Sequence, residues 1–180
     1  MTLTEAVKTC FSKYVTFSGR ASRPEYWFFF LFIVIWNAIA GFIDWQFFTT
    51  VSTLEANGTT TVTATSSQPV QSIVGLVVFL PHLAVAWRRM HDTGRSGLYA
   101  LFPLLLMIGA GLVLVFGIGI ADVFAGGGSM DLLFTRVTVL ILIPTMIVAL
   151  VSPLLVLWWL TRPSQPGDNR FGPAPQETRA

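Results

Sequence analysis

Four long apolar runs divide the chain, and polar stretches separate them. None of the four contains Asp, Glu, Lys or Arg, and their apolar residues follow neither the alternation of a strand nor the one-sided spacing of a surface helix. As helices the two shorter runs reach roughly 27 Å, which nearly matches a hydrocarbon core about 30 Å thick. We therefore expect membrane spans at residues 26–43, 70–87, 97–121 and 137–160.

Helices are the favoured form for these runs. A helix satisfies every backbone polar group within its own span, whereas a membrane β-barrel needs a period-2 alternation that the runs lack. The sequence predicts an all-α membrane protein with four transmembrane helices in a bundle, formed by residues 26–160. Residues 1–25 are predicted as a cytoplasmic amphipathic N-terminal segment, and residues 161–180 as a cytoplasmic tail.

Two shorter segments have patterns of their own. Residues 2–15 place apolar side chains at spacings of three and four, which predicts a short helix that either lies in the membrane interface or docks on the bundle. The Thr-rich connection at residues 57–69 is uncharged and is expected to be an exterior loop or a short hairpin.

Composition agrees with the membrane interpretation. Hydrophobic residues make up 53% of the chain and charged residues 11%, against about 25% charged residues in soluble domains. The single cysteine, Cys10, excludes an intramolecular disulfide, and the sequence offers no metal-binding cysteine spacing. Residues 1–25 lack the apolar core of a secretory signal.

The distribution of positive charge predicts the orientation. Ten of the 11 lysine and arginine residues precede the first span, follow the second or follow the fourth: Lys8, Lys13, Arg20, Arg23, Arg88, Arg89, Arg95, Arg162, Arg170 and Arg179. The two remaining connections hold only Arg136. Because positive residues favour the cytoplasmic side, both termini and the connection at residues 88–97 are expected in the cytoplasm, on a multi-pass protein of the bacterial inner membrane.

Three polar motifs fall on that predicted cytoplasmic side. They read SGRASRPEYW at residues 18–27, RRMHDTGRSG at residues 88–97 and PGDNRFG at residues 166–172. In this order they resemble the bacterial membrane family catalogued as domain of unknown function 805, over nearly the whole chain. The resemblance implies a small multi-helix inner-membrane protein whose biochemistry is not established. Leu98 and Tyr99 stand where that family often has Trp.

The motifs supply the candidate binding residues. Arginine suits an anionic ligand because its planar guanidinium donates two hydrogen bonds to phosphate or carboxylate. The alternative is that these arginines anchor the bundle to headgroups and pair with Asp92, Glu25 and Asp168. The candidate ligand-binding residues are Arg20, Arg23, Glu25, Arg88, Arg89, His91, Asp92, Arg95, Ser96, Asn169 and Arg170.

His82 and Asn37 are the candidate functional polar residues inside the spans. His82 follows Pro81, which lacks a backbone donor and leaves the carbonyl one turn earlier unpaired. Asn37 lies in the first span and is expected to be an interhelical partner of His82.

These features favour a binding or scaffold module that uses the cytoplasmic arginine cluster to hold anionic lipid or a protein partner. The alternatives are a small-solute transporter or channel subunit, acting as a homo-oligomer with His82 and Asn37 along its path, and a lipid-headgroup enzyme acting through His91 and Asp92. No catalytic residue, metal, cofactor or nucleic-acid partner is assigned.

Overall fold

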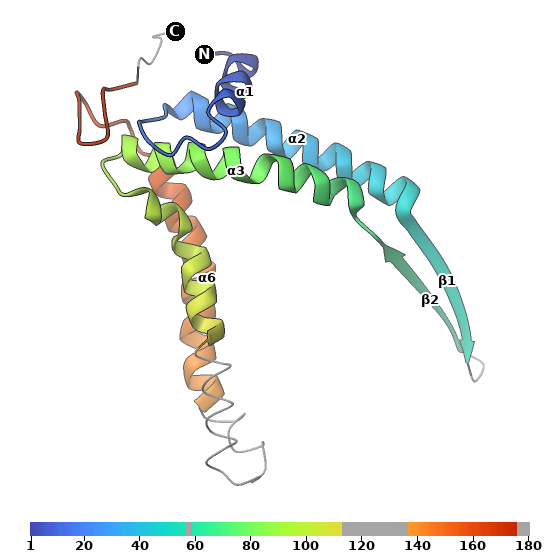
Figure 1. Ribbon diagram of the computed structural model, residues 1–180. Helices are drawn as coiled ribbons and strands as arrows, with labels where there is room; N and C mark the ends of the chain where they lie inside the picture. The colour runs from blue at the N-terminus through green and yellow to red at the C-terminus, as the bar shows by residue number, and fades with distance from the viewer. Residues whose placement is uncertain (57–58, 113–136, 176–180) are drawn as a thin grey trace.

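The computed structural model describes residues 1–56, 59–112 and 137–175. Two helix pairs extend in different directions from a shared end, where both described termini lie (Figure 1). Residues 102–112 form a helical stretch that directly continues η1. The labelled elements are α1 (Leu3–Ser12), α2 (Arg23–Phe48), β1 (Thr49–Ala56), β2 (Thr59–Ser66), α3 (Pro69–Asp92), η1 (Gly97–Leu101) and α6 (Val137–Thr161).

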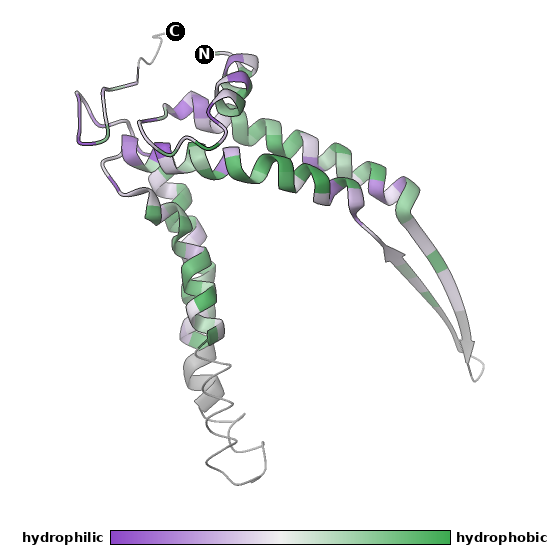
Figure 2. Ribbon diagram, in the orientation of Figure 1, coloured by the Kyte–Doolittle hydropathy of each residue, from purple (hydrophilic) through white to green (hydrophobic). Residues whose placement is uncertain are grey.

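Three helices are long and apolar enough to cross a membrane: Arg23–Phe48, Pro69–Asp92 and Ile143–Thr161. Gly97–Leu112 is a shorter apolar helix, and the rest of the predicted span at residues 97–121 lies outside the described residues. Four spans therefore stay a prediction. Hydrophobic residues run along both pairs, while hydrophilic ones gather at the shared end (Figure 2).

The connection after α2 corrects the all-α prediction. Helix α2 continues five residues past the expected boundary at residue 43, and an antiparallel hairpin follows, paired from Thr49↔Ser66 to Ala56↔Thr59. The hairpin alternative is thus confirmed. Its Thr and Val residues are β-branched, and such side chains favour the extended backbone.

The expected bundle takes a different form. Helix α2 packs along α3 as one pair, and the stretch at residues 102–112 lies beside α6 as the other, but the two pairs meet only near the shared end (Figure 1). Apolar helix surfaces have no hydrophobic drive to associate in lipid, so helices join only where specific contacts exist. Between the two pairs, the described contacts of that kind lie at the shared end.

Helix α1 docks on this end, so the docked alternative for residues 2–15 is confirmed. A capping box between Thr2 and Glu5 begins the helix. Phe11 then packs edge-on against Phe29 and Phe32 of α2, with ring centroids 5.7 and 6.0 Å apart. The core of the shared end contains Cys10, Ala21, Tyr26, Phe29, Val85, Ala86, Met90, Val156 and Leu160.

The carbonyl that Pro81 leaves unpaired has a partner. Residue 77 is four positions before Pro81, and its carbonyl accepts a 2.7 Å hydrogen bond from the Tyr14 hydroxyl. Tyr14 comes from the segment after α1. The proline therefore creates an acceptor inside α3 that fastens the N-terminal segment to it.

At the far end, α2 and α3 are joined by a carboxylate. Asp44 is 1% exposed, and its two oxygens accept the backbone N–H groups of Val70 and Gln71 at 3.0 and 2.8 Å. These donors belong to the first turn of α3, where a helix leaves N–H groups unpaired and favours negative charge. Asp44 is therefore part of the helix pair and not of an exterior loop.

We expect Tyr14→Phe to lower the free energy of unfolding by about 1 kcal/mol, since it leaves the Val77 carbonyl without its donor. In a Pro81→Ala background the cost should be smaller, because residue 81 then has an N–H to offer that carbonyl. Unfolding of the four variants in mixed micelles measures both costs. If Tyr14→Phe lowers the free energy of unfolding equally in both backgrounds, the Tyr14 hydroxyl does not compensate for the hydrogen bond that Pro81 removes.

Candidate functional site

The three polar motifs converge at the shared end, as their common predicted side implies. Five charged residues of the first two motifs form a buried cluster, here called the polar hub. Its members are between 0% and 8% exposed. Burying charge is costly unless each group is paired and hydrogen-bonded. The polar hub consists of Arg20, Glu25, Arg88, Arg89 and Asp92.

Asp92 is shared by two arginines. Nε and Nη2 of Arg20 both lie 2.9 Å from Oδ1 of Asp92, and Nη1 of Arg89 donates to Oδ2. All three side chains are at most 1% exposed. Each carboxylate oxygen therefore has its own cation, and the last residue of α3 is joined to the segment before α2.

The same two arginines hold the chain after α6. Arg20 donates to the carbonyls of Gln165 and Gly167, both at 2.7 Å. Arg89 donates through Nε to the carbonyl of Leu160 at 3.1 Å, and through Nη2 to that of Arg162. A guanidinium at the last carbonyls of α6 also matches the negative end of the helix dipole.

Glu25 and Arg88 form the second buried pair. Nη1 of Arg88 donates to Oε1 of Glu25 at 2.5 Å, and Ser22 caps α2 by accepting the Glu25 N–H at 3.3 Å. The other two nitrogen positions of Arg88, Nε and Nη2, have no hydrogen-bond partner in the described part of the chain. Burial, followed by the charge of Glu25, raises the pKa of the nearby Cys10 thiol to about 12.

This pairing differs from the expected one in detail. The alternative interpretation of the motifs named Asp92, Glu25 and Asp168 as partners of the arginines. Asp92 pairs with Arg89, three residues away, and Arg88 pairs with Glu25. Asp168 makes no salt bridge with a described residue, and its carboxylate accepts the Ala174 N–H at 3.2 Å.

His91 docks the PGDNRFG segment onto the polar hub. Its ring stacks on Phe171 with centroids 3.9 Å apart and planes 3° from parallel. Nδ1 lies 3.0 Å from the carbonyl of Gly19, and Asn169 donates to the His91 carbonyl at 3.0 Å. Because Asp92 is occupied by arginines, it does not orient His91.

Two glycines in the connection after α3 serve different purposes. Gly94 has a φ of 77°, in the region that favours glycine. At Gly97 the reason is close approach, because a Cβ there would lie 2.0 Å from the ring of Trp87. Ser96, between them in the motif, accepts the Leu98 N–H at 3.4 Å and so caps η1.

Four arginines surround the polar hub without joining its ion pairs. None makes a salt bridge with another residue of the described ranges. Three lie over aromatic rings: Arg95 over Trp159, Arg162 over Trp158 and Arg170 over Phe171. The fourth donates from Nε to the carbonyl of Arg162 at 3.0 Å. We call this set the cationic rim: Arg23, Arg95, Arg162 and Arg170.

Arg162 is a rim residue that the candidate set omitted. The available signal was its position directly after the Trp158–Trp159 pair at the end of an apolar run, since aromatic rings and cations collect together at membrane interfaces.

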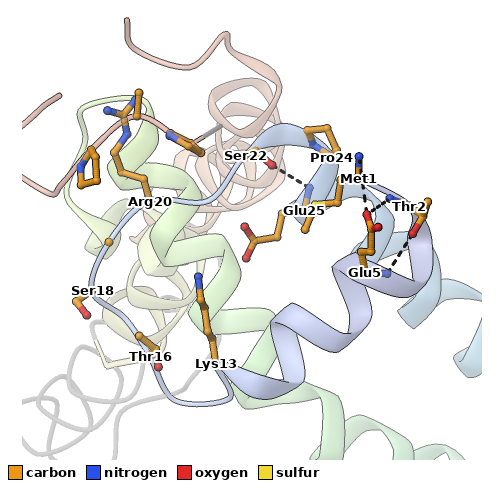
Figure 3. Close-up of a pocket in the computed structure, with 14 residues that line it drawn as sticks. Met1, Thr2, Glu5, Lys13, Thr16, Ser18, Arg20, Ser22, Pro24 and Glu25 are labelled. Carbon is orange, nitrogen blue, oxygen red and sulfur yellow. Dashed lines mark hydrogen bonds and ion pairs between the residues drawn. The ribbon is translucent and has the colours of Figure 1, made fainter. Parts of the chain in front are cut away.

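A cleft of about 640 Å³ opens beside the polar hub (Figure 3). The first turn of α1, the segment after it and the chain at residues 173–175 surround it. The Glu25 and Lys13 side chains point into the opening from different sides (Figure 3). Its lining includes both carboxylates (Glu5, Glu25) and cations (Lys13, Arg20), so it has no single charge preference.

The side chains of Asn37 and His82 do not contact each other. Asn37 donates to the carbonyl of Ile33 in its own helix at 3.0 Å. His82 stacks against Tyr26 of α2, with ring centroids 5.9 Å apart. Tyr26 lies roughly 16 Å along α2 from Asn37. The expected interhelical pair is therefore wrong. Among the described residues, no group of three or more His, Cys, Asp or Glu side chains could hold a metal ion.

We expect Asp92→Asn to lower the free energy of unfolding by about 3–5 kcal/mol, because Arg20 and Arg89 stay buried without their anion. Asp168→Asn is the matched control: its carboxylate is exposed, and surface changes of this kind usually stay within about 0.5 kcal/mol. The free energies of unfolding of the two variants are measured in mixed micelles and compared with that of the wild type. Similar values for the two variants would rule out Asp92 as the centre of the polar hub.

Known proteins resemble this chain in sequence. The family model described as "Protein of unknown function (DUF805)" matches residues 14–173. Inner membrane protein YhaH of Escherichia coli strain K12 is 39% identical over 107 residues, covering 57% of this chain and 75% of that protein. Inner membrane protein YhaI of the same strain is 40% identical over 103 residues, covering 57% and 74%. No solved structure matches the chain significantly. Since the matched residues include most of the chain and nearly all of the three motifs, the chain belongs to the DUF805 family.

Proposed function

We propose that this chain is an integral protein of the bacterial inner membrane and acts as a binding or scaffold module that holds anionic lipid at its cytoplasmic face. Three helices with the length and hydropathy of membrane spans support the membrane assignment. Its relatives YhaH and YhaI are named as inner membrane proteins.

The observation that carries the binding role is the division of the arginines into two sets. Arg20, Arg88 and Arg89 are buried and form ion pairs with Asp92 and Glu25. They hold the scaffold and have little charge to offer an outside ligand. The cationic rim has no carboxylate partner among the described residues. A cation near an anionic membrane surface contributes about 1 kcal/mol to binding.

The orientation follows from the same charges. The described lysines and arginines lie in α1 or directly after it, in the hub or in the rim, all at the shared end, whereas the β1–β2 hairpin lies at the far end of α2 and α3 (Figure 1). Positive residues favour the cytoplasmic side. In this proposal the polar hub and both termini face the cytoplasm, and the hairpin faces the exterior.

The alternatives have less support. A transport path along His82 and Asn37 would need these side chains near one another, but His82 of α3 lies beside Tyr26, at the start of α2, and Asn37 lies about three turns further along α2. A headgroup enzyme would need His91 and Asp92 to act together, but His91 contacts Gly19 and Phe171 while Asp92 is held by two arginines.

Cysteine labelling tests the orientation. Cys10 should react slowly at pH 8, because a thiol pKa of about 12 leaves little thiolate. We expect a cysteine at exposed Thr16 to react with a membrane-impermeant maleimide only after permeabilisation, and one at exposed Ser52 in the hairpin to react in intact spheroplasts. The reverse pattern would overturn the proposed topology.

Lipid binding tests the module itself. The wild-type chain in nanodiscs should enrich phosphatidylglycerol over phosphatidylcholine in its bound lipid, and the enrichment should fall with added salt. Changing all four rim arginines to Gln should remove it, since each charge is worth about fivefold in affinity. Lipid quantification by mass spectrometry measures the enrichment. A wild-type chain with no preference between the lipids would refute the proposed binding role.

A further inference from the structure

A small cleft lies where the connection after α3 meets the chain after α6. It has a volume of about 240 Å³ and is lined by Thr93, Arg95, Arg162, Pro163 and Gln165. We call it the arginine notch. Its two cations come from segments far apart in the sequence, and both belong to the cationic rim.

Backbone hydrogen bonds to the end of α3, which contains the hub residue Asp92, fix the two segments that line the arginine notch. The Gln165 N–H donates to the Asp92 carbonyl at 2.9 Å, and the Arg95 N–H donates to the Met90 carbonyl at 3.0 Å. Gly94 allows the close approach, since a Cβ there would lie 2.7 Å from Oε1 of Gln165. The spacing of the two arginine backbones is therefore set by the hub and not by a ligand.

The two guanidinium groups are oriented by tryptophan rings. Cζ of Arg95 lies 5.2 Å from the Trp159 ring centroid, and Cζ of Arg162 lies 4.2 Å from that of Trp158. A ring contacts the face of the guanidinium and leaves its N–H edges available to an acceptor. The one hydrogen bond seen for the Arg95 side chain is a 3.4 Å contact with the Thr93 carbonyl. Two cations are thus brought together without an anion from the described residues.

Apolar surface adjoins the arginine notch. Trp158 is 52% exposed and Leu157 is 39% exposed on the last turns of α6. Leu98 and Tyr99, in the η1 turn that follows Arg95, are 56% and 44% exposed. A ligand that fits both features carries a phosphate next to hydrocarbon, as a phospholipid does. Free phosphate would use the arginines and leave the apolar surface uncovered.

We propose that the arginine notch binds the phosphodiester of an anionic phospholipid. Arg95 and Arg162 donate to the non-bridging oxygens, the side-chain nitrogen of Gln165 supplies a further donor, and the acyl chains lie against Trp158 and Leu157. This inference rests on the proposed function and assigns its principal subsite within the cationic rim.

The test is a lipid titration of the full chain in detergent, followed by native mass spectrometry. The probes are phosphatidylglycerol, phosphatidylcholine and inorganic phosphate. Arg95→Gln/Arg162→Gln removes the notch cations. Its matched control, Arg23→Gln/Arg170→Gln, removes the same charge elsewhere on the rim. We expect both variants to bind phosphatidylglycerol more weakly than wild type, and the notch variant to bind it at least tenfold more weakly than its control.

A charge-preserving variant keeps the test sharp if the Gln variant folds poorly. Arg95→Lys/Arg162→Lys retains both charges and loses the bidentate fork, so we expect a clear loss of affinity at an unchanged unfolding temperature. Binding as tight as wild type would overturn the two-arginine contact. Competition by millimolar inorganic phosphate would show that the notch takes free phosphate and would overturn the lipid assignment.

The outcomes separate this inference from the proposed function. Equal losses in the notch variant and its matched control would show general attraction by the rim, which leaves the lipid-binding role standing and removes the notch as its subsite. A wild-type chain that binds phosphatidylglycerol no better than phosphatidylcholine would remove both.

Discussion

The carboxylate of Asp92, shared between Arg20 and Arg89, is the interaction on which the rest of the structure depends. A buried ion pair is often no better than a well-packed apolar contact, because removing charges from water is expensive. Here the arginines also donate to backbone carbonyls of the chain after α6. Removing the Asp92 carboxylate would therefore weaken the connection between three segments: the segment before α2, the end of α3 and the chain after α6.

The need for such a centre follows from the surroundings of the helices. Hydrocarbon is as apolar as the helix surfaces, so only specific contacts bring spans together. Away from the hub, Asp44 of α2 accepts the first N–H groups of α3, and Tyr14, from the segment after α1, donates to the α3 carbonyl that Pro81 leaves unpaired. The second helix pair is joined to the first at the shared end alone, through the polar hub and its adjoining core (Figure 1).

The order of the polar motifs was enough to predict their convergence, because positive charge leaves a local signal. The motif order was not enough to predict which carboxylate each arginine contacts. Arg88 and Arg89 are neighbours in sequence, yet they contact carboxylates from different segments, and only the tertiary fold sets that choice. Asp44 was missed because a charge at the end of an apolar run resembles the start of a loop. Arg162 was missed because its companion Arg95 is distant in sequence.

Charge accounting connects the orientation of the protein with its proposed binding. In the polar hub, three arginines face two carboxylates, so one positive charge is left over. The cationic rim adds four more cations without described carboxylate partners. An end this positive is costly to move across a bilayer and is stabilised beside anionic headgroups. The charges that would hold this end in the cytoplasm are therefore also those left to bind lipid, and the buried arginines contribute by keeping the rim in place.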